Sequence, residues 1–342
     1  MTTFDQATGL AHGSFGIATF RKPGSSDFPA LVLPDATVFD LSSWYRDTHA
    51  ILEDWDRALQ RLNDLAASRS LPELRYESLV PRPVLAHPNV LGAGANYRQH
   101  VAEMMTYNKF NQHNRKAGES DADFFARNLA EIDRRAREGM PFFWIGLHSA
   151  LVGANDNIEL PLIGQQPDWE LEFGVVVART ARYRRPTETG ALIAGYVMVN
   201  DLGTVDEFRR ADVKWGHDWV SKSQPTFKPF GPFLVPKEFV DRSQVRIHLA
   251  VNGRTMQDWP ITDMIFSPEQ ILSYATERIR LLPGDLLFTG SPPGNGAMRG
   301  QFLKPGDIIE SSITYLGRQK NLVVAENAEG RAPTFGPFIT EW

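Results

Sequence analysis

Short apolar runs dominate the sequence beyond residue 140. Runs of this kind are typical of β-strands when glycine, proline, asparagine or aspartate closes them. The expected strands are ELEFGVVVA, ALIAGYVMVND, QVRIHLAVNG, DLLFTG and DIIESSITYL, and one further helix is expected near SPEQILSYATERI. This part of the chain is therefore predicted to consist mostly of β-structure.

The N-terminal part shows a separate pattern. Residues 14–42 alternate short apolar runs with Gly, Pro and Asp turns, which predicts a few antiparallel strands. Residues 49–67 carry apolar side chains at helical spacing and predict one amphipathic helix. The segment LVPRPVLAHP indicates an extended connector, because proline disfavours helix at the residue before it. We expect a small β-rich domain over residues 1–85, a larger domain over 86–325 and a C-terminal tail over 326–342.

Two helices are expected early in the larger domain. NVLGAG predicts a strand, and the NYRQHVAEMM that follows it predicts a short helix with His100 and Glu103 on one face. The polar residues 106–140 contain a second helix, which Asp121 could cap and Gly139 could end. The apolar stripe of this second helix consists of Phe125, Leu129, Ile132 and Ala136.

The composition excludes several classes of site and partner. The chain has no cysteine, so it cannot form disulfides, thiolate nucleophiles, iron-sulfur clusters or cysteine zinc sites. A net charge of -5, with no dominant block of one sign, argues against nucleic acid and membrane partners. No run approaches the roughly 20 apolar residues of a membrane span, and MTTFDQATGL lacks the pattern of a signal peptide. We expect a soluble, cytoplasmic protein that acts on a small molecule.

Acidic residues gather at the start of one expected strand. Alternate residues of a strand share a face, so Asp168, Glu170 and Glu172 should project together. They could mark a solvated strand edge, but the VVVA that follows is apolar on both faces and indicates entry into the interior. Buried carboxylates need a cation or a raised pKa. Asp201 ends the next apolar run, and oxygen donors from two strand ends suit Mg²⁺ or Mn²⁺, with Ca²⁺ as a further alternative.

Several motifs occur in the same order as in one known family. They are Asn96-Tyr97 with His100 and Glu103, then DWELE, GYVMVND, SKSQPTFKPFGPFLV, VNGRTMQDWPITDMIFSPEQILSY, PGDLLFTGSPPGNG and LKPGDIIE. Over residues 90–325 the sequence resembles the fumarylacetoacetate hydrolase family. The resemblance implies an α+β, mostly β architecture, with a mixed β-roll catalytic domain behind a small N-terminal β domain. It also implies a homodimer that binds Mg²⁺ or a similar ion.

The resemblance implies metal-assisted chemistry on oxo-acids or diketones, with Glu170, Glu172 and Asp201 on the metal-ligand positions. A divalent ion would act as a Lewis acid on two neighbouring substrate oxygens and stabilise the enolate that leaves when a C–C bond breaks. His100 would deprotonate water, and Glu103, three residues further along the helix, could hydrogen-bond and orient the imidazole. A surface or capping role is the alternative for this histidine.

Further residues are assigned to the substrate by the same resemblance. Lys222 matches the lysine of the family's substrate pocket and would stabilise a developing oxyanion, although most lysines are simply solvated. Thr289 and Gly290 could donate to a substrate carboxylate or carbonyl, or they could form a structural turn. Tyr97 is also assigned to substrate binding.

The sequence departs from the family pattern at the substrate contacts. Many members carry an arginine and a glutamine where this chain has Val205 and Phe208, and Arg209 could replace the arginine if the alignment has a gap there. Gly146 holds the place of a usual lysine. Loss of a guanidinium removes a bidentate anion partner, which favours a larger, more apolar diketone over a small acylpyruvate. Residues 106–140 could form a lid over such a substrate or a dimer contact.

Three functions remain open from the sequence. The first is hydrolytic C–C cleavage of a 1,3-dicarbonyl compound by water that the His-Glu pair activates. The second is a lyase or isomerase reaction, meaning hydratase, decarboxylase or dehydratase, on an oxo-acid at the same metal site. The third is a non-catalytic relative that only binds a ligand.

Overall fold

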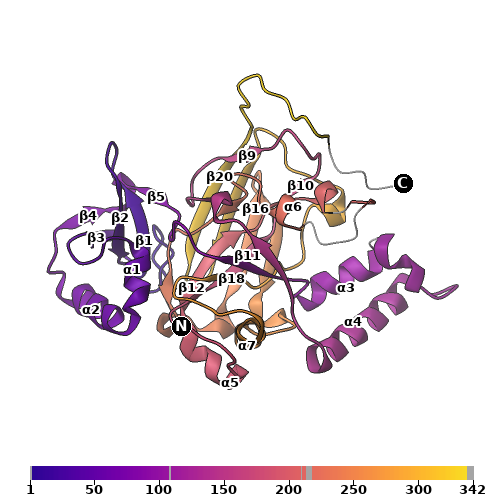
Figure 1. Cartoon of the computed structure of the whole chain (residues 1–342), viewed down its shortest axis with the longest axis horizontal. Coiled ribbons are helices and arrows are strands. Elements are labelled where there is room, and N and C mark those ends of the chain that lie inside the picture. Colours follow the sequence, from indigo (N-terminus) through magenta and orange to yellow (C-terminus); the bar gives the residue numbers. More distant parts are fainter. Residues whose placement is uncertain (1, 108, 209, 213–217, 337–342) are drawn as a thin grey trace.

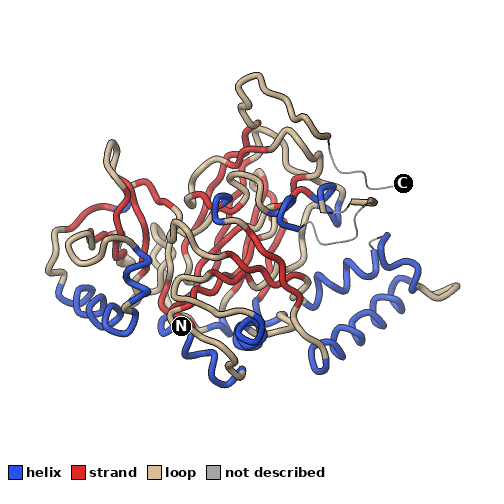
Figure 2. Tube along the Cα trace, viewed as in Figure 1, coloured by secondary structure: helices blue, strands red, loops and turns tan. Residues whose placement is uncertain are grey.

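The computed structural model of the chain describes residues 2–107, 109–208, 210–212 and 218–336. Figure 1 shows a smaller N-terminal part at one side, a larger central part built around β-strands, and two helices that project from the opposite side. Figure 2 shows that the strands gather inside the larger part and that helices lie on its outside. The combination of sheets and peripheral helices confirms the predicted α+β class.

The N-terminal part is built on one antiparallel sheet in the order β4-β3-β2-β1-β5. Its strands are β1 Gly16–Arg21, β2 Asp27–Val32, β3 Thr37–Asp40, β4 Glu73–Arg75 and β5 Val80–Arg82. The strands expected over residues 14–42 are therefore confirmed. The last strand, β5, lies inside the segment predicted to be an extended connector.

Two helices replace the single helix predicted over residues 49–67. They are α1 Thr48–Glu53 and α2 Trp55–Ser68. The Asp47 side chain caps α1 by accepting from the Ala50 N–H, and Asp54 between the helices has φ -121° and ψ 38°, outside the helical region. The apolar spacing continues across this break, which is why the sequence pattern did not reveal it.

The larger part contains a mixed six-stranded sheet in the order β15-β12-β11-β18-β6-β7. Its strands are β6 Val90–Gly94, β7 Phe142–Gly146, β11 Leu171–Val177, β12 Ile193–Asn200, β15 Val235–Pro236 and β18 Leu286–Phe288. Within this sheet β18 and β6 run parallel, and the other neighbours run antiparallel. Every residue of β11 and β12 is buried, as their apolar runs predicted, and this burial includes Glu172 of β11 and Asn200 of β12.

A five-stranded sheet in the order β17-β16-β19-β20-β9 accompanies it. Its strands are β9 Ile158–Leu160, β16 Arg246–Val251, β17 Arg254–Pro260, β19 Ile308–Ile313 and β20 Gly317–Ala325. Two short pairs complete the strands: β8 Leu151–Val152 with β14 Lys228–Pro229, and β10 Pro167–Asp168 with β13 Gly203–Thr204. All five strands expected beyond residue 140 are present.

Among the described residues of the larger part, α-helices lie around these sheets. They are α3 Arg98–Tyr107, α4 Asp121–Glu138, α5 Pro186–Thr189, α6 Asp218–Lys222 and α7 Pro268–Arg278. The two projecting helices in Figure 1 are α3 and α4. Ser120 caps α4, since its side chain accepts from the Asp123 N–H, so the predicted cap at Asp121 is wrong by one residue. Gly139 follows the helix as predicted.

The stripe of α4 packs against the neighbouring helix. Ile132 joins Val101 and Ala102 of α3 in one apolar cluster, and the Asn128 amide donates to the Thr106 hydroxyl at 3.0 Å. Arg98 and Asp133 form a bidentate ion pair between the two helices. The buried side chains of α4 are Phe124, Asn128 and Ile132, so the predicted stripe is right at Ile132, while Phe125, Leu129 and Ala136 are only partly buried. The roles of lid and dimer contact both stay predictions.

The N-terminal sheet shares its apolar clusters with the larger part. One cluster joins Phe20 of β1 to Phe173 of β11, and a second joins Ile17 to Val199 of β12. The division at residue 85 therefore stays a prediction about domains that pack tightly together. Among the described residues, no helix is long and apolar enough to cross a membrane.

Candidate active site

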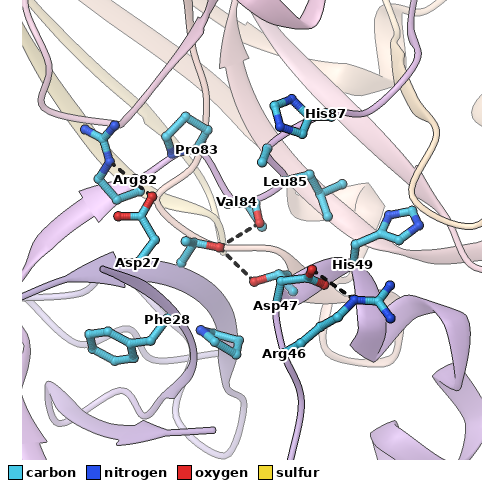
Figure 3. Close-up of a pocket in the computed structure, with 14 residues that line it drawn as sticks. Asp27, Phe28, Arg46, Asp47, His49, Arg82, Pro83, Val84, Leu85 and His87 are labelled. Atoms are coloured by element: carbon cyan, nitrogen blue, oxygen red, sulfur yellow. Dashed lines mark hydrogen bonds and ion pairs between the residues drawn. The ribbon is translucent and has the colours of Figure 1, made fainter. Parts of the chain in front are cut away.

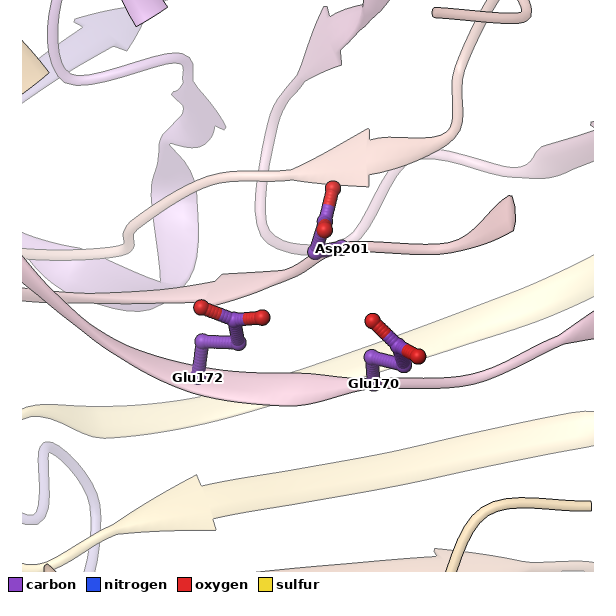
Figure 4. Close-up of side chains that lie close together, drawn as sticks. All are labelled: Glu170, Glu172 and Asp201. Carbon is purple, nitrogen blue, oxygen red and sulfur yellow. The ribbon is translucent and has the colours of Figure 1, made fainter. Parts of the chain in front are cut away.

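Three carboxylates converge where two central strands meet. Glu170 and Glu172 flank the first residue of β11, and Asp201 directly follows β12, its antiparallel neighbour. One oxygen from each carboxylate lies within 4.8 Å of the others, and Figure 4 shows the two glutamates on one side of the same strand, close to Asp201. The predicted trio is therefore brought together.

The trio sits where negative charge is costly. Glu172 is 2% exposed and Asp201 is fully buried. The pKa of Glu172 lies well above its usual range, because burial and the charges of Asp201 and Glu170 all oppose its ionised form. Burial also raises the pKa of Glu170, although Lys222 opposes this shift. Three hard oxygen donors whose buried negative charges must be compensated fit a divalent cation such as Mg²⁺ or Mn²⁺.

Two buried lysines face these carboxylates. Lys222, at the end of α6, pairs with Glu170, and its Nζ lies 3.0 Å from Asp201 Oδ2. Lys228, in β14, is fully buried and pairs with Asp201 Oδ1. Burial alone would lower the pKa of Lys222, but the charges of Asp201 and Glu170 raise it above its usual range. Burial lowers the pKa of Lys228, although Asp201 opposes the shift.

Asp201 has one oxygen that accepts no hydrogen bond. This oxygen, Oδ2, is buried, and the Lys222 ammonium is near. Its Oδ1 is taken by Lys228. A buried carboxylate oxygen without a hydrogen bond is costly unless a cation completes it. This orphaned oxygen supports the fit of the site to a divalent ion.

Backbone and side-chain donors orient the two glutamates. The Gly290 N–H donates to Glu172 Oε2 at 2.6 Å, and the Asn295 amide donates to Glu170 Oε1 at 3.1 Å. The Thr289 hydroxyl donates to the Phe173 carbonyl at 2.7 Å. Thr289 and Gly290 therefore point their donors at protein groups, and the structural alternative describes them better here than the predicted substrate contact.

The sequence predicted one strand face for Asp168, Glu170 and Glu172, but Asp168 ends the short strand β10, and β11 begins only at Leu171. The Asp168 carboxylate accepts hydrogen bonds from the backbone N–H groups of Trp169, Gly296 and Ala297 at 2.7–2.8 Å. It thereby fixes the loop that carries Asn295 against the start of β11. Asp168 holds this wall of the site in place and is not part of the carboxylate trio.

His100 is buried within reach of the charge of Lys222, but it does not pair with Glu103 in the way the sequence predicted. Its imidazole Nδ1 has no hydrogen-bond partner. Glu103 instead accepts from the Gln99 amide at 2.9 Å, one helical turn away on α3. Burial lowers the pKa of His100 to about 4, and the positive charge of Lys222 acts in the same direction. The ring is therefore neutral at physiological pH and can accept a proton.

The remaining predicted residues line the surroundings. Tyr97 is fully buried, and its hydroxyl has no hydrogen-bond partner. Burial raises the pKa of Tyr97 well above its usual value, and the charge of Glu172 adds to the effect. The Phe208 ring lies 5.6 Å from Lys222 Nζ, which places it beside the site. Arg209 lies outside the described residues.

A second cleft, of about 490 Å³, lies between the N-terminal sheet and the connector. Figure 3 shows Arg46 and Arg82 on its walls, each close to an aspartate. Arg46 pairs with Asp47, and Arg82 lies 3.7 Å from Asp27. Positive and negative charges are thus balanced in this cleft, and it contains none of the carboxylates described above.

Comparison with known proteins places this constellation in a family. The family model described as "Fumarylacetoacetate (FAA) hydrolase C-terminal" matches residues 89–324, more than half of the chain. The chain belongs to the fumarylacetoacetate hydrolase family. A 2,4-didehydro-3-deoxy-L-rhamnonate hydrolase of Sphingomonas sp. (strain SKA58) is 39% identical over 54% of this chain and 65% of its own length. A mitochondrial oxaloacetate tautomerase of Bos taurus is 36% identical over 54% of this chain and 59% of its own length.

Solved structures confirm the family fold. The fumarylacetoacetate hydrolase of Exiguobacterium antarcticum has a TM-score of 0.72 at 22% identity and covers 92% of this chain and 100% of its own. A maleylpyruvate hydrolase of Sphingobium sp. SYK-6 has a TM-score of 0.68 at 18% identity, with 91% and 100% covered, and was solved with manganese(II) and pyruvate. The chain matches less than two thirds of the length of the two sequence relatives.

Two residues of the site were not singled out from the sequence. Lys228 and Asn295 both lie in quoted motifs, TFKPFGP and PPGNG, but neither was assigned a role. A lysine inside a run of aromatic, proline and glycine residues is a usable signal, because a lysine is rarely buried unless it is paired. Asn295 offered no comparable signal, since an asparagine between glycines is typical of a turn.

Proposed function

We propose that this fumarylacetoacetate hydrolase family protein is a metal-dependent hydrolase that cleaves a C–C bond of a 1,3-dicarbonyl compound. The observation that carries the proposal is the buried, neutral His100, whose Nδ1 has no hydrogen-bond partner and whose ring is affected by the charge of Lys222, the lysine that pairs with the carboxylate trio. A neutral imidazole can take a proton from water at the pH of a cell. Cleavage by water needs such a base next to the bound dicarbonyl.

The residues of the site divide the remaining tasks. Glu170, Glu172 and Asp201 would hold Mg²⁺ or Mn²⁺, which when bound supplies Lewis-acid polarisation of the substrate oxygens. Lys222 carries a positive charge within the same cluster and can stabilise negative charge that develops on a substrate oxygen. The Tyr97 hydroxyl, fully buried beside Thr289, could donate to a bound substrate.

The Phe208 ring beside Lys222 supports an apolar diketone as the substrate. Phe208 lies beside Lys222, where many family members place a polar side chain that contacts the substrate acid. A phenyl ring offers apolar surface and no anion partner. We propose that the substrate carries an apolar group on this side of its dicarbonyl unit.

Replacing Phe208 by glutamine should shift specificity towards small dicarboxylic oxo-acids. We expect kcat/KM for an apolar diketone to fall by about 10-fold, because the lost ring burial is worth about 1–2 kcal/mol, while the value for oxaloacetate or an acylpyruvate rises or stays constant. Steady-state assays on both substrate types give the ratio. The matched control is Phe335→Gln, since that ring is 83% exposed. Equal losses on both substrates would contradict the specificity role.

The reaction class can be decided with isotopically labelled water. Turnover of an apolar 1,3-diketone with Mg²⁺ in ¹⁸O-water should place one ¹⁸O atom in a carboxylate product, because hydrolysis adds the oxygen of water to the cleaved acyl carbon. Mass spectrometry of the products measures this. A product with an unchanged carbon skeleton would show a lyase or isomerase instead. The tautomerase relative and the absence of a Glu103 contact at His100 Nδ1 favour this second candidate.

We also propose that the protein forms a homodimer through the open edge of the large sheet. The edge strand is β7, and residues in and next to it expose large apolar side chains, namely Met140, Phe142, Ile145 and Leu147. A twofold axis next to an edge strand buries the same side chains from both copies. Light scattering that gives the mass of a single chain at micromolar concentration would contradict this proposal.

A further inference from the structure

Lys228 is enclosed by two aromatic rings, and its ammonium meets a hydrogen-bond acceptor on one side. The side chain is fully buried, and its Nζ lies 4.5 Å from the centroid of the Trp144 ring and 5.4 Å from that of Phe288. The two rings meet edge to face at 5.7 Å. Its only hydrogen bond among the described residues goes to Asp201 Oδ1. A lysine inside such a cage is held against this carboxylate.

Two glycines make the cage possible. A Cβ atom at Gly92 would lie 1.9 Å from Trp144 Cε2, so any side chain there would displace the indole. A Cβ atom at Gly146 would lie 2.8 Å from Trp144 Cζ3 and 3.1 Å from Lys228 Cε. The absence of a side chain at position 146 is therefore what admits the lysine from β14. The cage is built from four different strands, β6, β7, β14 and β18.

The contact with Lys228 occupies Oδ1 of Asp201, so Oδ2 lies on the side of Glu170, where the Lys222 ammonium is 3.0 Å from Oδ2 and also pairs with Glu170. The backbone of Asp201 is already fixed, since its N–H donates to the Glu170 carbonyl at 2.8 Å and its carbonyl accepts from Lys222 at 2.9 Å. The carboxylate could still rotate about its bond to Cβ, and the hydrogen bond from Lys228 to Oδ1 prevents this rotation. Oδ2 is left buried, without a hydrogen bond, as the atom available to a cation.

We propose that Lys228 is a positioning residue of the metal centre, which holds Asp201 by one oxygen so that the other is presented to the divalent ion. This inference rests on the metal site of the proposed function. The inference adds to that metal site a residue, Lys228, that would contact neither the ion nor the substrate. Groups that orient metal ligands from outside typically contribute 10–100-fold to metal affinity or activity.

The proposal predicts the opposite result from a purely electrostatic role. Removing a positive charge makes the cluster one unit more negative, and this change alone would strengthen cation binding. Loss of positioning weakens it. In Lys228→Met, which keeps most of the apolar stem, we expect Mn²⁺ to bind 10–100-fold more weakly than in the wild type. The readout is free Mn²⁺ measured by electron paramagnetic resonance with metal-free protein, which requires no turnover.

The lack of cysteine allows a chemical rescue at this one position. In Lys228→Cys the new thiol is the only one in the chain, so 2-bromoethylamine in denaturant converts that side chain alone into an ammonium of lysine length. After refolding, the alkylated protein should recover most of the Mn²⁺ affinity that the unmodified variant has lost. Wild-type protein taken through the same treatment and the surface variant Lys320→Met are the controls.

A variant that retains the lysine covers the case in which the neutral variants do not fold. Gly146→Ala places a methyl group against Lys228 Cε and Trp144, and should weaken Mn²⁺ binding. Gly190→Ala, at a glycine with open space around it, should not. Folded Lys228 variants that bind Mn²⁺ as tightly as the wild type, or more tightly, would overturn the proposal, and so would unchanged affinity in Gly146→Ala. Failure of the wild type to bind Mn²⁺ would instead overturn the metal site itself.

Discussion

Replacement of Glu172 by glutamine is expected to remove most of the affinity for Mg²⁺ and Mn²⁺ and nearly all catalytic activity. The substitution keeps the volume of the side chain and an oxygen that can accept from the Gly290 N–H. It removes only one negative charge and one ligand atom. Because this residue would contact the ion directly, its loss should exceed the roughly 10–100-fold effect of residues that only orient ligands.

Calorimetric titration of metal-free protein with Mn²⁺, together with activity at saturating Mg²⁺, measures both effects. Glu73→Gln is the matched control, since this glutamate is exposed on β4 in the N-terminal sheet. The control should behave as the wild type. Full Mn²⁺ affinity in a folded Glu172→Gln variant would show that the carboxylate trio is not the metal site.

Replacement of His100 by asparagine is expected to lower kcat by about 10²–10⁴-fold, the usual contribution of a general base. Metal affinity should stay within a few fold of the wild type, because the imidazole is not one of the three converging ligands. His12→Asn, at an exposed position, provides the control. A variant with normal kcat would remove His100 from the mechanism.

The pH dependence of the wild type should carry the signature of the same residue. The pKa of His100 is lowered from its ordinary value to about 4, so the base is lost only when the pH falls through that range. In the wild type, kcat/KM should therefore stay flat as the pH falls from 7 to about 5 and decrease below it. A decrease centred near pH 6.5 would show that a histidine with an unshifted pKa is responsible.

The strands that carry the site could be predicted from the sequence, because their largely apolar composition indicates that they are buried. An apolar run such as VVV of β11 or GYVMV of β12 is stable only between other layers of the protein, and acids in the same strand or directly after it must then be close to the interior. The apolar runs and the family resemblance together predicted that Glu170, Glu172 and Asp201 lie close together, and in the structure they do.

Contacts between distant segments could not be predicted in the same way. Lys228 reaches Asp201 only because Gly92 and Gly146 leave space for Trp144, and no local pattern encodes that packing. The same holds for the Gly290 N–H, which meets Glu172 across the fold. The predicted pairing of His100 with Glu103 relied on helical spacing alone, and Gln99 competes for the same carboxylate on the same helix.

The most direct test of the metal centre is anomalous diffraction from crystals grown with Mn²⁺. We expect one strong anomalous peak between the carboxylates of Glu170, Glu172 and Asp201, within coordination distance of Asp201 Oδ2, while Oδ1 keeps its contact with Lys228. Crystals in which Mn²⁺ occupies another position, and the trio has no peak, would contradict it.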